Sequence, residues 1–144
     1  MIPAKKEQCF SGLTRSELMS RIKSRGNKKT EIAFLLELRR EKLTGWRRHA
    51  KLPGRPDFVF QKAKVAIFLD GCFWHGCPIH YKAPRTRRIF WNSKIERNKS
   101  RDRKNNRMLR SLGWKVIHIW EHDLTKSRIE RVLARLKIKL NADD

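Results

Sequence analysis

The segment Asp70–His80 constrains this chain most, because it places an acid, two cysteines, two histidines and two large aromatics within eleven residues. It follows the apolar run Val65–Leu69, which predicts a central strand covered on both faces. Two of the chain's three cysteines lie in this segment. We therefore expect that the other elements serve to position it.

The hydrophobic pattern of the remaining chain predicts alternating helices and strands. Thr14 and Glu17 fit a capping box at the start of a short first helix. Helices are expected at about 15–23, 30–42, 90–112 and 127–140, and strands at about 46–49, 57–60, 64–69 and 114–120. This order predicts an α/β fold with a small mixed sheet between helices. We expect a single domain over 14–144 that follows a flexible N-terminal arm over 1–13.

The charge of the chain indicates a polyanionic partner. Lys and Arg number 36 against 14 acidic residues, which gives a formal net charge of +22. Such a field attracts a nucleic-acid phosphate backbone, although a ribosome-associated or membrane-surface protein would share it. No apolar run approaches the roughly 18 residues that a membrane helix needs, and Met1–Gly12 lacks the apolar core of a signal peptide. We expect an intracellular nucleic-acid-binding protein, and its charge and size suit a monomer.

Two acids flank a pair of predicted strands. Asp57 opens one strand and Asp70 closes the next, so antiparallel pairing would bring these ends side by side. Mg²⁺ prefers oxygen ligands, keeps several waters and contacts phosphates, which makes this edge a candidate Mg²⁺ site. A metal there would stabilise the attacking and leaving oxygens of a phosphodiester displacement. The alternative is that Asp57 caps a turn and Asp70 is an exposed loop acid.

The spacing of cysteines and histidines indicates a second, structural metal site. Cys72 and Cys77 are five residues apart, and His80 follows three residues later. Thiolates and imidazoles this close are typical ligands of structural zinc, and a tetrahedral site needs a fourth ligand. His122 is the best candidate and His75 is its competitor. The alternative is a pair of free, buried cysteines with histidines on the surface.

His75 has two open roles. If His80 and His122 complete the zinc site, His75 remains free to act as a general base or acid beside a metal-bound water. Otherwise it is itself a zinc ligand or a phosphate contact.

Aromatic residues in this segment and basic residues after it are candidates for contacts with DNA. Phe73 and Trp74 are adjacent large aromatics in a glycine-flanked loop, which could stack on bases or wedge between them. The alternative is that they pack in a core under a zinc knuckle. Residues 85–110 hold 11 basic and 2 acidic residues, and 96–107 hold no apolar residue, so this helix is solvated or faces a polyanion. Its candidate phosphate contacts are Arg97, Arg101 and Arg103.

These residues together resemble the very-short-patch mismatch repair endonucleases, over residues 17–125. The matching strings are Met19–Lys23, Lys29–Glu31, Leu52–Asp57, Asp70–His80, Phe90–Trp91 and Gly113–His122. The resemblance implies a restriction-endonuclease-like fold, with a central mixed sheet flanked by helices. It also implies Mg²⁺-dependent nicking of duplex DNA 5′ to the thymine of T:G mismatches, which arise when 5-methylcytosine deaminates.

The resemblance also implies roles for single residues. Asp57 resembles the principal Mg²⁺ ligand, and the backbone carbonyl of Leu69 resembles a second ligand. His75 resembles the catalytic histidine, and Glu31 the helix-borne acid near the metals. The aromatics inserted beside the mismatch correspond to Phe73 and Trp74, and the structural zinc ligands to Cys72, Cys77, His80 and His122.

The chain departs from the family pattern at Asp70, where some members carry histidine. Asp70 is therefore either a metal ligand or a partner of His75. The nuclease lysine that usually stands two residues after the second acid is replaced by Cys72, which excludes a lysine-based mechanism and raises the weight on His75.

Two rival functions remain open. A non-enzymatic zinc DNA-binding module needs the Cys/His set and the charge but has no use for Asp57 or Glu31. A DNA nuclease of different specificity would keep the acids. Family members work with mismatch-repair proteins and a DNA polymerase, and the resemblance implies a bacterial, cytoplasmic, nucleoid-associated protein.

Overall fold

A four-stranded mixed sheet forms the centre of the computed structural model, which describes residues 14–17 and 28–141. Its strands are β1 (Trp46–Arg48), β2 (Phe58–Phe60), β3 (Val65–Asp70) and β4 (Lys115–Trp120), in the spatial order β1-β2-β3-β4. The first three strands pair antiparallel, and β4 pairs parallel to β3. A parallel pair needs a long crossover, and here it contains the longest helix of the described chain.

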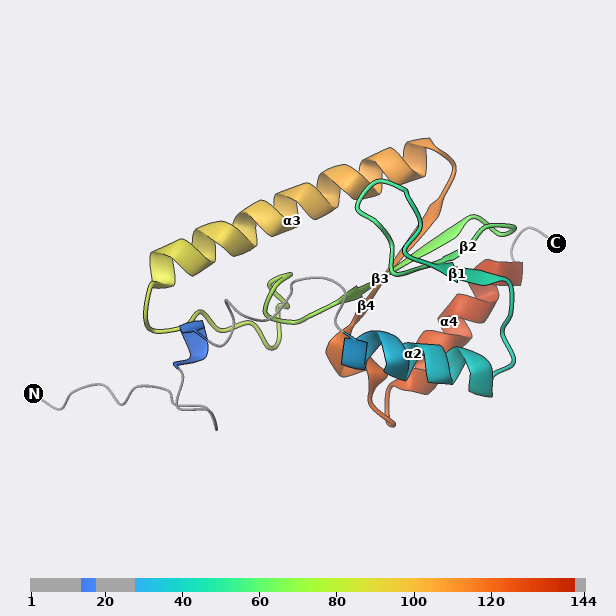
Figure 1. The fold of residues 1–144 in the computed structure, drawn as a ribbon, viewed down its shortest axis with the longest axis horizontal. Coiled ribbons are helices and arrows are strands. Elements are labelled where there is room, and N and C mark those ends of the chain that lie inside the picture. The colour runs from blue at the N-terminus through green and yellow to red at the C-terminus, as the bar shows by residue number, and fades with distance from the viewer. Residues whose placement is uncertain (1–13, 18–27, 142–144) are drawn as a thin grey trace, which may run out of the picture.

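Helices cover both faces of this sheet (Figure 1). α3 (Arg88–Ser111) crosses one face, and α2 (Lys28–Arg40) and α4 (Ile129–Asn141) lie together on the other. A 3₁₀ turn, η1 (Glu121–Leu124), follows β4. The predicted α/β fold with a mixed sheet flanked by helices is confirmed, whereas the restriction-endonuclease-like assignment remains a prediction.

The main hydrophobic core lies between the sheet and the helix pair α2 and α4. Phe34 of α2 meets Phe58 of β2 edge-on, with ring centroids 5.1 Å apart, and Leu133 and Leu136 of α4 close the same core. On the opposite face, Leu109 of α3 packs against a second cluster of strand residues. Residues 65–68 of β3 are at most 1% exposed, which confirms the prediction of a central strand buried on both faces.

α3 is polar along much of its length, yet one of its faces is not solvated. Asn98, Asp102 and Asn106 recur at intervals of four and point toward the loop after β3 and toward β4, where each makes a hydrogen bond. The expectation that all of 96–107 is solvated or faces a polyanion is therefore corrected. The inner stripe is polar because it meets polar groups of the protein, and only the outer faces are left for solvent or DNA.

The short N-terminal piece 14–17 packs near the start of α3. Thr14 and Glu17 exchange the two hydrogen bonds of a capping box, at 2.8 and 3.2 Å, as predicted. The indole N–H of Trp91 donates to the Ser16 hydroxyl at 2.7 Å. Most of the helix expected at 15–23, and the arm expected at 1–13, lie outside the described residues. Within the described chain, no helix combines the length and apolarity needed to cross a membrane.

Candidate active site and metal sites

The four residues predicted to bind zinc lie together. Cys72, Cys77 and His80 come from the loop after β3, and His122 comes from η1 after β4. Because β3 and β4 run parallel, both segments leave the same edge of the sheet. The Nδ1 atom of His122 lies 3.2 and 3.8 Å from the sulfurs of Cys72 and Cys77, and the Nδ1 atom of His80 lies 4.0 and 3.7 Å from them.

These separations fit one tetrahedral ion. With zinc–sulfur and zinc–nitrogen bonds of about 2.3 and 2.1 Å, neighbouring ligand atoms are about 3.6 Å apart. Burial raises the pKa of the Cys72 thiol to about 12, so without a metal this sulfur keeps its proton at neutral pH. The set is Cys₂His₂, a donor set that suits a structural metal, and His75 is not part of it.

Asp57 is seated against the backbone of β3. The residue is 4% exposed, and its carboxylate accepts a hydrogen bond of 2.7 Å from the N–H of Leu69. In an extended strand the N–H and C=O of one residue point to the same side, so the Leu69 carbonyl faces the same edge. The expected neighbourhood of Asp57 and Leu69 is thus present.

Asp70 lies at the same end of the β2–β3 pair but has other partners. Its Oδ2 atom is 2.6 Å from Nδ1 of His118 on β4, and its Oδ1 atom is 3.8 Å from Nε2 of His75. The second nitrogen of His118 is 2.8 Å from the side-chain oxygen of Asn106 on α3. Asp70 Oδ1 has no hydrogen-bond partner among the described residues, so both roles considered for Asp70, metal ligand and partner of His75, stay predictions.

Glu31 and His49 complete the surroundings of Asp57. A ligand atom from each of the three residues lies within 4.8 Å of the others. Glu31 stands in the first turn of α2, is 3% exposed and pairs with Arg48 at the end of β1. Glu31 was predicted near the metal from the resemblance, but His49 and Arg48 were not predicted, because isolated basic residues carry no spacing signal in so basic a chain.

His75 forms a dyad with an acid that sequence reasoning missed. Its Nδ1 atom is 2.5 Å from Oδ2 of Asp102 on α3, and its Nε2 atom is buried without a hydrogen-bond partner among the described residues. A carboxylate on one imidazole nitrogen fixes the tautomer and leaves the other nitrogen available as a base. The interval of four between Asn98, Asp102 and Asn106 is the sequence signal that would have identified this helix face.

Phe73 and Trp74 lie in a small core of their own. They are 7% and 5% exposed and pack edge-on against Trp91, with ring centroids 5.4 and 5.8 Å from it. Core packing under the metal site, the alternative considered for these aromatics, therefore describes this conformation. Their contact with DNA bases stays a prediction.

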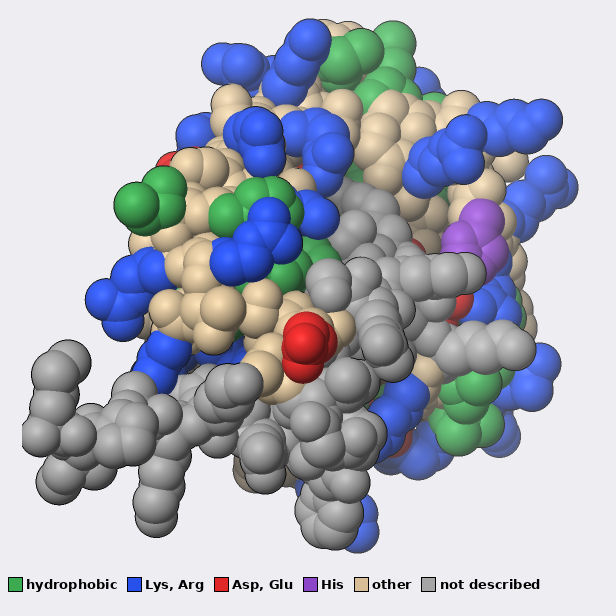
Figure 2. Space-filling view, turned by 60° about the vertical axis from the view of Figure 1, so that its left-hand side comes forward, with side chains coloured by type: hydrophobic (Ala, Val, Ile, Leu, Met, Phe, Trp, Pro, Cys, Tyr) green, Lys and Arg blue, Asp and Glu red, His purple; other side chains and the backbone are tan. Residues whose placement is uncertain are grey.

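The three predicted phosphate-binding arginines, Arg97, Arg101 and Arg103, are all exposed on α3. Arg101 also donates to the side-chain oxygen of Asn98 at 2.7 Å, and Asn98 holds the Trp74 carbonyl at 3.0 Å. Figure 2 shows Lys and Arg side chains over much of the described surface on this side, with few acidic ones in view. The outer face of α3 thus carries the positive charge that a DNA backbone requires.

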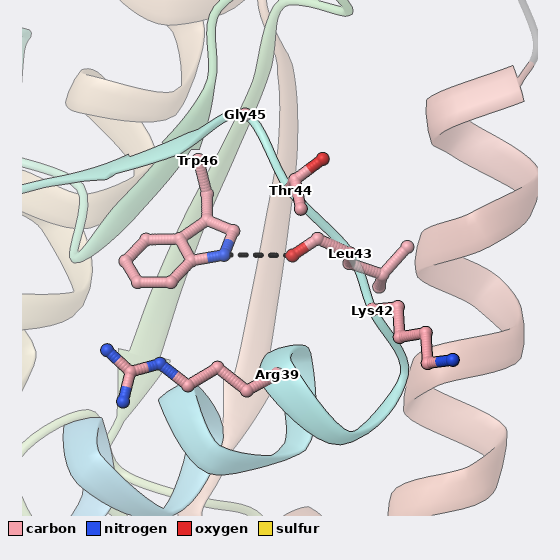
Figure 3. A pocket seen from close by; sticks show the side chains of 6 residues that line it. All are labelled: Arg39, Lys42, Leu43, Thr44, Gly45 and Trp46. Carbon is pink, nitrogen blue, oxygen red and sulfur yellow. Dashed lines mark hydrogen bonds between the residues drawn. The ribbon is translucent and has the colours of Figure 1, made fainter.

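A pocket of about 480 Å³ lies elsewhere, where the chain passes from α2 to β1. Trp46 folds over it and donates from its indole N–H to the Leu43 carbonyl at 3.0 Å (Figure 3). The lining holds no acid, cysteine or histidine, which are the side chains that the predicted metal and proton-transfer chemistry needs. We place the candidate active site at the strand ends.

Comparison with known proteins identifies relatives. The family model described as DNA mismatch endonuclease Vsr matches residues 8–81. The DNA mismatch endonuclease Vsr of Escherichia coli K12 is 48% identical over 73 residues, which cover 50% of this chain and 47% of that protein. The type II nicking enzyme V.NaeI of Lentzea aerocolonigenes is 44% identical, over 57% of this chain and 49% of its own length.

The matched part of the chain thus spans about half the length of these two relatives. A third relative, the type II nicking enzyme V.NmeDIP of Neisseria meningitidis serogroup C, is 38% identical over 120 residues. That match covers 78% of this chain and 77% of the relative. The matches, together with the Cys/His and acid clusters at the strand ends, show that the chain belongs to the Vsr DNA mismatch endonuclease family.

Proposed function

We propose that the chain is a metal-dependent endonuclease that nicks one strand of duplex DNA at T:G mismatches and so starts very short patch repair. The observation that carries this proposal is that Asp57 contacts Leu69, while His75 of the His75–Asp102 dyad lies 3.8 Å from Asp70, the next residue at the end of β3. Metal-dependent hydrolysis of a phosphodiester needs a carboxylate that binds the metal ion and a base that is held in one orientation. The names of the relatives, a mismatch endonuclease and nicking enzymes, support the same reaction class.

Asp57 and the Leu69 carbonyl would hold Mg²⁺, as the oxygen chemistry of this edge allows. When bound, the ion supplies charge stabilisation to the scissile phosphate. His75 takes the proton of the attacking water on its Nε2 atom, while Asp102 stabilises the resulting imidazolium through Nδ1. Burial of the His75 side chain and its contact with Asp102 keep the imidazole in one orientation. Asp70 borders this dyad through its contact with His75.

Cys72, Cys77, His80 and His122 would hold Zn²⁺. Their donor atoms fit a tetrahedral site, and zinc there would tie the loop that carries His75 to the end of β4. The role is structural, since all four ligands come from the protein. It would keep Phe73 and Trp74 on a defined loop beside the active site.

DNA recognition would use the outer face of α3 and the aromatic pair. The exposed arginines of α3 grip phosphates, and unstacking costs least at a weakened base pair. Phe73 and Trp74 would have to leave their core to reach the bases, which couples mismatch binding to a rearrangement of the loop. The proposal includes a restriction-endonuclease-like fold, action as a monomer and later steps by mismatch-repair proteins and a polymerase.

A nicking assay tests this function. Zinc-loaded protein is mixed with end-labelled duplexes that carry a T:G mismatch, a G:C pair or a flap, with Mg²⁺ or with EDTA. We expect Mg²⁺-dependent cleavage of the thymine strand of the T:G duplex alone. Asp57→Asn should abolish this cleavage. Glu130→Gln, the same carboxylate-to-amide change at an exposed position of α4, should leave it unchanged. Binding without cleavage would indicate the zinc-module rival, and cleavage of the flapped duplex would indicate a nuclease of other specificity.

A further inference from the structure

We propose that Glu31, His49 and Asp57 bind one divalent cation through two carboxylates and an imidazole nitrogen, so that the site takes Mn²⁺ in preference to Mg²⁺. This inference rests on the proposed function, because it names the ligands and the ion class of the same site. The nitrogen ligand is the new element. Mg²⁺ sites in proteins are built from oxygen, whereas imidazole shifts affinity toward first-row transition ions.

The geometry brings the three side chains to one point. A ligand atom from each lies within 4.8 Å of the others, and Nε2 of His49 is 3.4 Å from Oε2 of Glu31. In an octahedral site with bonds of about 2.1 Å, neighbouring ligands are about 3 Å apart and opposite ligands about 4.2 Å. Ligand atoms up to 4.8 Å apart must move closer together to share one ion, and the half-exposed His49 side chain is free to move.

A buried atom of Glu31 points to a missing partner. Glu31 is only 3% exposed, and its buried Oε1 atom has no hydrogen-bond partner in the described chain. Buried carboxylate oxygens are almost always satisfied, so an unsatisfied one at a cluster of ligands calls for a partner such as an ion. A cation between Glu31 and Asp57 would satisfy it.

The local charge also favours a cation. Glu31 and Asp57 bring two carboxylate groups to this point, and Arg48 pairs with Oε2 of Glu31. The Arg48 guanidinium also makes a cation–π contact with the ring of Phe58, with its central carbon 5.7 Å from the ring centroid. It can therefore keep its place on Glu31 while an ion occupies the other side.

His49 is held in a backbone conformation that places it at this point. Its φ is +52°, in the left-handed region that residues other than glycine seldom adopt. Its N–H donates to the Asp57 carbonyl at 3.3 Å, which ties the end of β1 to the start of β2. Such backbone strain tends to occur at functional sites, where it presets a side chain.

The test detects the nitrogen directly and does not depend on cleavage. Full-length protein with its zinc site loaded is titrated with Mn²⁺, and free and bound ion are followed by electron paramagnetic resonance. Spin-echo modulation then reports whether a ¹⁴N nucleus is bonded to the ion. Wild-type protein should bind one Mn²⁺ with ¹⁴N coupling, and more tightly than it binds Mg²⁺ in competition.

Matched variants identify the source of the nitrogen. His49→Gln should lose the coupling and weaken Mn²⁺ binding by about tenfold or more, while His75→Gln should keep the coupling. His49→Asp replaces the nitrogen ligand by an oxygen ligand. This variant should bind Mn²⁺ without ¹⁴N coupling, and its affinity for Mg²⁺ relative to Mn²⁺ should rise. Circular dichroism of each variant verifies the fold, which the change at the exposed His49 side chain should leave intact.

The outcomes separate this inference from the proposed function. Mn²⁺ that binds without ¹⁴N coupling, yet is lost in Asp57→Asn, would overturn the role of His49 and leave the nuclease site standing; His49 would then be an ion-pair partner of Glu31. Coupling that persists in His49→Gln would also overturn it. Binding that is indifferent to Asp57→Asn would overturn both proposals.

Discussion

The Nδ1 atom of His75 lies 2.5 Å from Oδ2 of Asp102, and this contact joins the loop after β3 to the middle of α3. The two residues are 27 positions apart in the chain. Asn98 and Asn106, one helical turn on either side of Asp102, hold the Trp74 carbonyl and His118. The inner face of α3 is thus a polar support for the site, while its outer face carries arginines.

Asp102→Asn should reduce nicking far more than it reduces stability. An amide in place of the carboxylate can hold the wrong tautomer of His75 and cannot stabilise an imidazolium, so kcat should fall by about 10²–10⁴-fold. Single-turnover nicking of the T:G duplex measures the fall. Glu96→Gln, on the exposed face of the same helix, is the control and should nick at the wild-type rate. Equal rates for the two variants would remove Asp102 from the mechanism.

Gly76→Ala should destabilise the fold by about 1–3 kcal/mol. Gly76 has a φ of +61°, and an added Cβ would lie 2.3 Å from Cε of Lys99 and 2.8 Å from Cγ2 of Ile95. Urea unfolding at constant excess zinc measures the loss. Gly45→Ala is the matched control, because its φ is +85° but nothing lies within 4 Å of the new Cβ. The difference between the two variants isolates the contact with α3, and no difference would contradict this packing.

Zinc affinity should fall as the pH is lowered. Burial raises the pKa of the Cys72 thiol to about 12, so its proton must leave when a metal binds at neutral pH. Release of that one proton alone predicts about a tenfold loss of affinity per pH unit between pH 8 and 6. Competition with a chromophoric chelator measures the slope. Cys77→Ser should bind zinc poorly at every pH, and a slope of zero in the wild type would argue against thiolate ligation by Cys72.

The sequence predicted the elements of this site better than their connections. The apolar run before Asp70 identified β3, and the Cys/His spacing after it identified three members of the candidate metal cluster, because both signals are local. His118, Asn106 and Asp102 were missed, since their roles depend on how α3 crosses the sheet. The absence of apolar residues from 96–107 was taken to mean that this part of the helix is solvated or faces a polyanion. The interval of four between Asn98, Asp102 and Asn106, which marks the inner face of the helix, was overlooked. For Trp74 the sequence left core packing and base contact both open, because its burial depends on Trp91 and Ile95 of α3.

The arginines on the outer face of α3 should set the salt dependence of DNA binding. Arg97 and Arg103 are both exposed, and each phosphate contact releases a counterion when DNA binds. The double variant Arg97→Ala/Arg103→Ala should lower the slope of log K against log salt by about two, equally for T:G and G:C duplexes. Fluorescence anisotropy across a salt series measures this slope. Arg131→Ala/Arg135→Ala, the same charge change on α4 behind the sheet, should leave it unchanged. A loss confined to the T:G duplex would instead mean that α3 reads the mismatch itself, and equal slopes for the two double variants would mean that DNA approaches another face.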